Sequence, residues 1–367
     1  MIKNKLGNFV KIRTGKLDAN ASSPNGEYPF FTCSKEPLKI SSYSYDCKCV
    51  LVAGNGDLNV KYYDGKFDAY QRTYIIESKD ESVLDVRYLY WFLFKYVEKL
   101  RELSIGGVIK YIKINNLIDP IIPLPPLEDQ KRIVKILNEA DALRQKRKQA
   151  TGLLDDYLKS VFLEMFGDPV KNPKGWKKQA LKLFGQIITG NTPPRNDTKN
   201  YSSDFIEWIK TDNIVADKIY LTSATEHLSE AGLNRARFVM PGAVLVACIA
   251  GSIESIGRNA ITNRKVSFNQ QINAIQPNAQ TNTFFLYWLL KISKQYIQIH
   301  STKGMKRILT KGSFEKIIMI APPRDVQDKF AKVFKKTDTL KQSMLAQSAE
   351  LETQFQALMQ KAFKGKL

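Results

Sequence analysis

The chain has 367 residues, of which 43% are hydrophobic, and a formal net charge of +20 from 56 basic and 36 acidic side chains. This length accommodates two ordinary domains, and no stretch approaches the ~20 apolar residues of a membrane span. Residues 1–16 lack the apolar core of a signal peptide, and the four cysteines do not make a disulfide framework. We therefore expect a cytoplasmic, non-membrane protein.

The positive charge is spread along the chain rather than gathered in a tail. A basic, folded protein most often meets nucleic acid, an anionic membrane or an acidic partner. The alternative is a basic soluble protein whose charge serves no ligand.

Residues 1–122 predict a first domain that is rich in short strands. Apolar, β-prone runs between turn formers predict strands at Tyr28–Cys33, Cys49–Ala53 and Ala69–Ile76. Turns are expected at Ala53–Asp57 and Tyr63–Lys66, a buried helix at Val86–Glu102, and a basic glycine-containing loop at Ile105–Lys110.

Residues 123–168 open with the pair Pro125-Pro126 and predict one long helix. Residues 321–367 contain the pair Pro322-Pro323 near their start, and from the proline pairs onward the two copies match at an offset of 197 without a gap until their last residues. Residues 169–320 repeat the plan of the first domain, since Thr189-Gly190 matches Thr14-Gly15 at an offset of 175. Such self-similarity indicates an internal repeat.

Both long helices carry apolar residues at alternating three- and four-residue steps, which is typical of a coiled-coil seam. In the first helix the seam is Ile133, Ile136, Ala140, Leu143, Arg147, Ala150, Leu154, Tyr157, Val161 and Met165. In the second it is Phe330, Val333, Thr337, Leu340, Met344, Gln347, Leu351, Gln354, Leu358 and Ala362. Two seams in one chain predict an antiparallel pair, a rod of ~50–60 Å. Arg147 either fixes the register of this pair or extends its charge into solvent.

The sequence with this organisation resembles the specificity subunit of type I restriction–modification systems. The segments that carry the resemblance are Leu51–Gly56 with Val60–Arg72, Pro123–Gln130 with its helix, Phe268–Gln271, and Lys361–Gly365. The resemblance implies an α+β fold with a pseudo-twofold repeat, in which 1–122 and 169–320 are target-recognition domains and 123–168 and 321–367 are helical spacers.

The resemblance also implies the partners and cofactors of the chain. Each domain would read one half of a split double-stranded DNA site, and the helices would set the spacer and seat two methyltransferase subunits. Restriction subunits would join the assembly, with S-adenosylmethionine, ATP and Mg²⁺ used by partners. The chain departs from the pattern in starting almost directly at the first domain, and in having Arg324 where the first copy has Leu127.

DNA is read by Arg or Lys on guanine and by Asn or Gln on adenine, while phosphates take basic side chains. The candidate DNA-binding residues lie on loops rich in such side chains: Arg13, Lys16, Arg72, Lys110, Arg195, Arg258, Lys303, Lys306 and Arg307. For each of them the alternative is a solvated surface charge. For Gln71, Gln270 and Gln271 a structural hydrogen bond is favoured over base contact.

No catalytic or metal-binding set is expected. The chain has no Gly-Lys-Ser/Thr tripeptide, no Pro-Asp dipeptide and no proline pair preceded by Asn or Asp. Cys47 and Cys49 lack partners at zinc-site spacing and are better explained as strand residues. The remaining alternative to a non-catalytic DNA reader is a coiled-coil scaffold that joins two protein partners.

Overall fold

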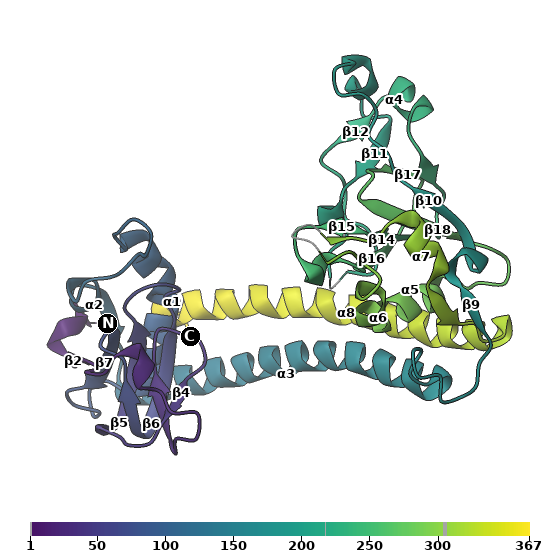
Figure 1. Cartoon of the computed structure of the whole chain (residues 1–367). Coiled ribbons are helices and arrows are strands. Elements are labelled where there is room, and N and C mark those ends of the chain that lie inside the picture. The colour runs from purple at the N-terminus through teal and green to yellow at the C-terminus, as the bar shows by residue number, and fades with distance from the viewer. Residues whose placement is uncertain (1, 217, 304–306) are drawn as a thin grey trace. The chain divides into compact units, whose positions relative to one another are not determined.

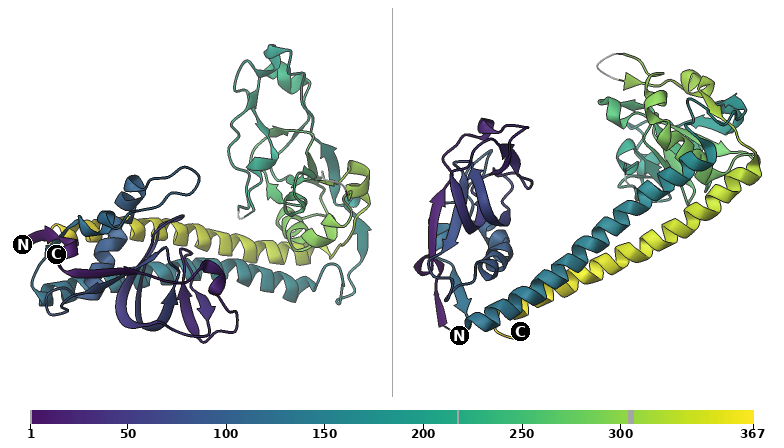
Figure 2. Two further views of the ribbon diagram at one scale, coloured as in Figure 1. Left: turned by 60° about the vertical axis from the view of Figure 1, so that its left-hand side comes forward. Right: turned by 90° about the horizontal axis from the view of Figure 1, so that it is seen from below.

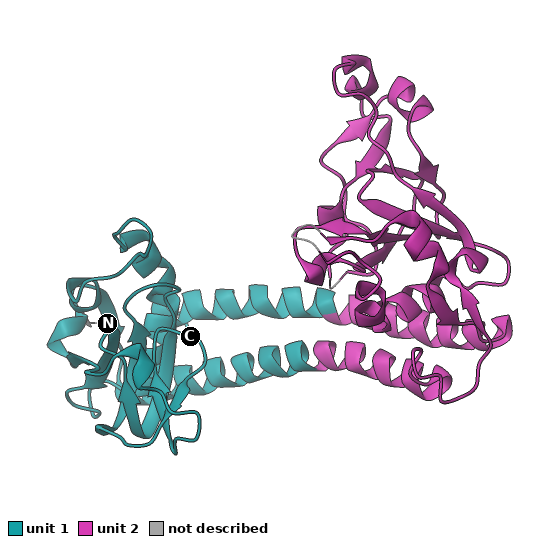
Figure 3. Ribbon diagram, viewed as in Figure 1, with its two compact units in different colours: residues 1–149, 345–367 teal, residues 150–344 magenta. Residues whose placement is uncertain are grey.

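The computed structural model describes residues 2–216, 218–303 and 307–367 (Figure 1). Contacts divide the chain into two units (Figure 3): unit 1 is 1–149 with 345–367, and unit 2 is 150–344. Each unit therefore contains one β-rich domain together with part of each long helix, α3 (Leu127–Phe166) and α8 (Arg324–Phe363).

Unit 1 is built on a six-stranded sheet of order β2-β7-β5-β6-β3-β4, in which only β3 and β6 run parallel. Helix α1 contacts the central strands β5 and β6. Its elements are β1 (Ile2–Lys5), β2 (Val10–Thr14), β3 (Tyr28–Phe31), β4 (Leu38–Ile40), β5 (Tyr45–Ala53), β6 (Val60–Ala69), β7 (Thr73–Ser78), α1 (Val86–Leu103), α2 (Asn115–Ile118) and β8 (Ile121–Leu124).

Two details of the predicted first domain are wrong. The turn expected at Tyr63–Lys66 lies inside β6, where Gly65 has a φ of +129° and still pairs with Cys47 of β5. The long ladder between β5 and β6 overrides the local turn preference of Asp64-Gly65. The strand expected from Ala69 begins only at Thr73, because Tyr70–Arg72 turn the chain from β6 into β7.

Unit 2 carries two four-stranded sheets, of order β10-β18-β14-β16 and β12-β11-β17-β13, in place of the six-stranded sheet of unit 1. The two sheets of unit 2 separate between β16 and β17. These strands correspond to the first and last parts of the long strand β6 in unit 1. Its elements are β9 (Lys178–Ala180), β10 (Gly185–Thr189), β11 (Ile206–Ile209), β12 (His227–Leu228), α4 (Glu230–Asn234), β13 (Phe238–Val239), β14 (Val244–Ala247), β15 (Ile249–Ala250), β16 (Asn259–Ile261), β17 (Val266–Phe268), β18 (Ile272–Pro277), α5 (Thr283–Ile292), α6 (Lys294–Gln298), β19 (Arg307–Ile308), α7 (Lys311–Lys316) and β20 (Ile318–Ile320).

The predicted repeat is confirmed by equivalent hydrogen bonds. The Leu6 amide donates to the Pro120 carbonyl at 2.8 Å, and the Leu181 amide donates to Ile317 at 2.9 Å. These residues keep the two predicted offsets, 175 for the first and 197 for the second.

A buried glutamine fastens the start of each long helix to the domain before it. Gln130 accepts from the Asp85 amide at 2.9 Å and donates to the carbonyls of Val83 and Pro125. Gln327 does the same in unit 2, where its partners are the Asn282 amide and the carbonyls of Gln280 and Pro322. We call this arrangement the glutamine clip. Its partners are backbone atoms in both units.

We expect Gln130→Ala to lower the free energy of unfolding of unit 1 by about 2 kcal/mol, because removal of the buried Gln130 side chain leaves the Asp85 amide and the carbonyls of Val83 and Pro125 without their partner. The thermal midpoint should fall by roughly 4–8 °C, as measured by calorimetry on the full chain. Gln145→Ala, at an exposed position of the same helix, is the matched control. An equal fall in both variants would show that the clip contributes nothing.

The ends of both long helices enter the domain cores. In unit 1, Leu137 of α3 and Phe355 of α8 are buried with the α1 residue Trp91. In unit 2, Phe162 of α3 and Phe330 of α8 pack with their ring centroids 5.3 Å apart. The helices lie side by side in both views of Figure 2.

Two ion pairs show that the helices run antiparallel, as predicted. Arg144 donates to Glu352 at 3.0 Å within unit 1, and Lys341 donates to Asp155 at 2.7 Å within unit 2. Each pair is the copy of the other at an offset of 197, so the pseudo-twofold relation extends to single contacts. The two cations are only 18% and 15% exposed.

The predicted phase of the seam is wrong near its centre. Leu143, Tyr157 and Leu340 are about half exposed, while the charged residues Arg144 and Lys341 take the inward positions. An apolar pattern cannot reveal this, because interhelical ion pairs replace apolar contacts there. Arg147 is half-buried and makes interactions of its own.

No helix within the described part of the chain is both long enough and apolar enough to cross a bilayer.

Candidate nucleic-acid interface

In unit 1, four segments meet where β2 and β5 end and β7 begins. We call this the loop end of the first sheet and define it by residues 14–16, 53–56, 70–72 and 104–111. The Gly54 amide donates to the Arg72 carbonyl at 2.7 Å, and the Gly56 amide donates to the Lys110 carbonyl at 3.0 Å. Three predicted DNA contacts, Lys16, Arg72 and Lys110, are thus brought together, and all three are exposed.

A concavity of about 290 Å³ opens at this loop end. It is lined by Thr14, Gly54, Gln71, Arg72, Tyr74 and Ile112. Among the described residues the Arg72 guanidinium has no ion pair or hydrogen-bond partner, so it is available to a ligand. Burial raises the pKa of Tyr74 above its ordinary value, which keeps its hydroxyl protonated.

Sequence reasoning missed two apolar residues at the tip of the 104–111 loop. Val108 is fully exposed and Ile109 is 63% exposed, beside the exposed Lys110. Apolar side chains contact thymine methyl groups and base steps in protein–DNA complexes. Their position in an irregular loop gives no periodic signal by which they could have been found.

Unit 2 builds an equivalent loop end from residues 189–190, 247–250, 258, 269–271, 301–303 and 307–309. The Cys248 amide donates to the Gln271 carbonyl at 2.8 Å, and the Leu309 amide donates to Cys248 at 2.7 Å. Arg258 is at this end, because its carbonyl accepts from the Ala247 amide at 2.8 Å.

Two further candidates, Lys303 and Arg307, belong to the last two segments of this loop end in unit 2, 301–303 and 307–309. Lys303 is exposed, and Arg307 donates to the Thr302 carbonyl at 3.0 Å. The remaining candidate of this loop, Lys306, lies outside the described residues.

Two candidates are held by contacts within their own domain. Arg13 pairs with Glu77 at 2.9 Å and lies over the Tyr45 ring, so its guanidinium covers the face of the sheet. Arg195 pairs with Glu226 at 2.7 Å and lies over the rings of Tyr201 and Trp208.

Glu226 is the common acceptor of Arg195 and Lys210, and the hydrogen bond from Lys210 is the main cause of its lowered pKa. A similar pair joins Arg264 to Glu207, whose pKa the guanidinium also lowers. Both carboxylates are therefore ionised at neutral pH. Glu207 lies on β11 and Glu226 directly precedes β12, so both carboxylates hold cations beside these two paired strands.

The three glutamines near the loop ends make the expected intrachain hydrogen bonds. Gln71 donates to Asp18 at 2.6 Å, and Gln270 accepts from the Thr192 hydroxyl. Gln271 accepts from the Asn269 side-chain amide at 3.1 Å.

Close backbone packing explains the matched glycines Gly15 and Gly190. A Cβ on Gly15 would lie 2.1 Å from the Ala69 carbonyl oxygen, and one on Gly190 would lie 2.2 Å from that of Asn269. The two matched glycines are thus needed to form the loop end, whatever its ligand.

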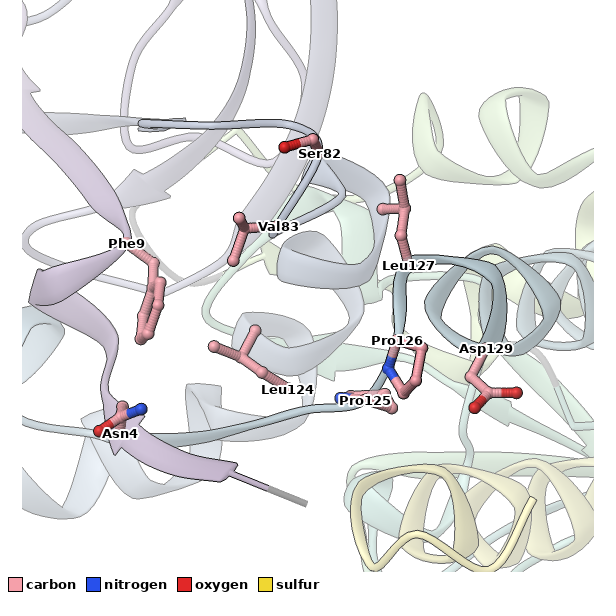
Figure 4. Close-up of a pocket in the computed structure, with 9 residues that line it drawn as sticks. All are labelled: Asn4, Phe9, Ser82, Val83, Leu124, Pro125, Pro126, Leu127 and Asp129. Atoms are coloured by element: carbon pink, nitrogen blue, oxygen red, sulfur yellow. The ribbon is translucent and has the colours of Figure 1, made fainter.

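A groove of about 650 Å³ lies beside the first proline pair (Figure 4). Its lining residues are Asn4, Phe9, Ser82, Val83, Leu124, Pro125, Pro126, Leu127 and Asp129. At the matching place in unit 2, Arg324 replaces Leu127 and donates to the Ala279 carbonyl at 2.7 Å and to Asp328 at 2.9 Å. The two helix starts therefore present different surfaces.

Among the described residues no three His, Cys, Asp or Glu side chains gather as a metal site would require. Cys47 and Cys49 are free thiols in β5, the second of them fully buried.

The model of the type I restriction modification DNA specificity domain matches residues 3–151 and 173–353, which is most of the chain and covers both copies of the repeat. The chain belongs to this family. The fold is similar to that in the crystal structure of the type I restriction-modification system S subunit from M. genitalium. The match covers 99% of our chain and 96% of that chain, with a TM-score of 0.63 at 14% identity. The fold is also similar to that of a chain from a structural study of complex assembly and conformational transition in the type I R-M system. That match covers 100% of our chain and 98% of the other chain, with a TM-score of 0.61 at 18% identity.

Curated members of the specificity-domain family are similar over shorter stretches. The EcoDI specificity subunit of Escherichia coli is 36% identical over 180 residues, and the HindI specificity subunit of Haemophilus influenzae is 31% identical over 174 residues. These matches cover 48% and 45% of our chain, but only 39% and 37% of the two relatives.

Proposed function

We propose that the chain is the non-catalytic DNA sequence-specificity subunit of a type I restriction–modification complex. The observation that carries the proposal is the duplicated loop end, which displays basic side chains in each copy of a family-defining domain. Residues 1–122 would read one half of a split site and residues 169–320 the other. Because the two loop ends differ in sequence, the two half-sites need not be related by symmetry.

The cations that support DNA binding best are Lys16, Arg72 and Lys110 in the first domain and Arg258, Lys303 and Arg307 in the second. Lys306 lies outside the described residues, and Arg13 and Arg195 would serve their domains rather than the ligand. Phosphate contacts supply affinity and base-edge contacts supply the sequence preference.

The long helices would set the length of the spacer between the half-sites and would bind the partner subunits. Leu143, Leu153 and Tyr157 of α3 and Leu340 and Leu345 of α8 are between 45% and 58% exposed. Apolar side chains in such number on the solvent side of a helix pair are typical of a protein interface. Two methyltransferase subunits are the proposed occupants, since the repeat offers two related surfaces and a family member is known from a study of complex assembly.

The chemistry would belong to those partners. S-adenosylmethionine would be used by the methyltransferase subunits, and ATP and Mg²⁺ by restriction subunits that join the complex. The four thiols are free, which agrees with the cytoplasm as the proposed compartment.

Salt-dependent DNA binding by the chain together with its methyltransferase subunits tests the proposal. If about six phosphates are neutralised, affinity should fall on the order of a thousandfold between 50 and 200 mM salt. A duplex with the methylated motif should bind at least tenfold more tightly than a scrambled duplex at the same salt concentration. Equal binding of both duplexes would instead favour a scaffold that joins two proteins.

A further inference from the structure

The turns that lead into β7 and β18 occupy equivalent places but carry different side chains. Arg72 and Gln271 correspond, because their carbonyls accept from the Gly54 and Cys248 amides at 2.7 and 2.8 Å. Each turn is also closed by a backbone hydrogen bond. The Thr73 amide donates to the Tyr70 carbonyl, and the Ile272 amide donates to the Asn269 carbonyl. The two turns therefore make equivalent backbone hydrogen bonds, and they differ in the side chain that they carry at this position.

Arg72 is presented to a ligand without competition from its own domain. Its side chain is exposed and lines the concavity that Thr14 and Tyr74 also line. No carboxylate pairs with it in the part of the chain that the structure describes, in contrast to Arg13 and Arg195. An unpaired guanidinium keeps its planar set of donors for two adjacent acceptors.

Gln271 is held in one orientation by Asn269, a residue that is only 6% exposed. The Asn269 amide donates to Gln271 Oε1 at 3.1 Å, while Asn269 Oδ1 accepts from the Gln271 backbone amide at 3.1 Å. Within the described ranges Gln271 Nε2 has no partner. The side chain thus presents the two N–H donors of Nε2 together with the remaining acceptor capacity of Oε1.

The two side chains match different bases. Arginine donates twice to O6 and N7 of guanine, and glutamine both donates and accepts at N7 and N6 of adenine. We propose that this turn is the specificity-determining position in both domains, with Arg72 selecting a guanine in the first half-site and Gln271 selecting an adenine in the second. The inference rests on the proposed function and names the base that each domain selects at one position.

The test exchanges the two side chains in the complex with methyltransferase subunits and maps the methylated motif genome-wide. With Arg72→Gln, the preference for guanine over the other bases at one position of the first half-site should fall by on the order of tenfold or more. The second half-site should be unchanged. With Gln271→Arg, one adenine of the second half-site should lose its preference by a similar factor. Gln295→Arg adds the same charge at an exposed position of α6 and should leave the motif unchanged.

Arg72→Lys separates base selection from charge, because lysine keeps the charge and can still contact guanine. It should retain the guanine with a lower methylation rate. If Arg72→Gln lowers methylation equally at all sites with the motif intact, Arg72 contacts phosphate and the inference is overturned. A half-site that contains no guanine in the wild-type motif overturns it as well. In either case the proposed function stands if the wild-type complex still prefers its own motif.

Discussion

Replacing residues 1–120 with the corresponding domain of another family member should change one half of the methylated sequence and leave the other half as it was. The effect is large because base selection is assigned to loop ends that lie wholly within one domain. The measurement is genome-wide mapping of methylated sites in cells that contain the chimera and its partner subunits.

The structure indicates what such a chimera must keep. The glutamine clip needs only the backbone of residues 83 and 85, which any well-aligned donor supplies. The contact of α1 with the helices also needs side chains, since Trp91 donates to Asn138 at 3.0 Å and packs against Phe355 with ring centroids 5.6 Å apart. A donor with tryptophan at position 91 is therefore the proper choice. A change in both half-sites, or in neither, would contradict the modular model.

Removing one heptad from each helix should shorten the unread spacer by about three base pairs. Deletion of residues 145–151 and 345–351 takes ~10 Å from each helix, and DNA rises 3.4 Å per base pair. Seven residues keep the phase of the packed faces, and both ion pairs, Arg144–Glu352 and Lys341–Asp155, keep facing partners. Motif mapping gives the spacer length directly.

Deletion of residues 145–151 alone is the matched control. It leaves Arg144 and Lys341 unable to reach their acceptors at the same time, because the two pairs then require registers that differ by seven residues. We expect this variant to lose methylation rather than to change its spacer. An unchanged spacer in the double deletion would mean that the helices do not set the distance.

The repeat and the long helices could be predicted from the sequence because their signals are local and occur twice. The proline pairs, the matched Gln130 and Gln327, and the Thr-Gly pairs all have structural roles in both units. The seam centre could not be predicted in the same way. Its inward residues include Arg144, whose burial depends on Glu352, 208 positions away.

The candidate site was predictable only in part, for a similar reason. Arg72 lies on a turn and Lys110 in an irregular loop, where basic side chains stay exposed. Arg13 lies on a strand, and which face a strand residue covers depends on partners such as Glu77 and Tyr45 that are distant in sequence. Arg195 likewise has an acceptor, Glu226, that lies 31 positions away in the sequence.

The glutamine clip has a consequence for how this protein can evolve. Its hydrogen bonds end on main-chain atoms, so drift in the side chains of residues 83, 85, 280 and 282 leaves its acceptors and donors intact. Natural selection for a new DNA target and natural selection for a sound joint therefore act on separate atoms. A first domain exchanged at this joint would therefore keep the clip, and its fit to the helices would depend on the side chain at position 91.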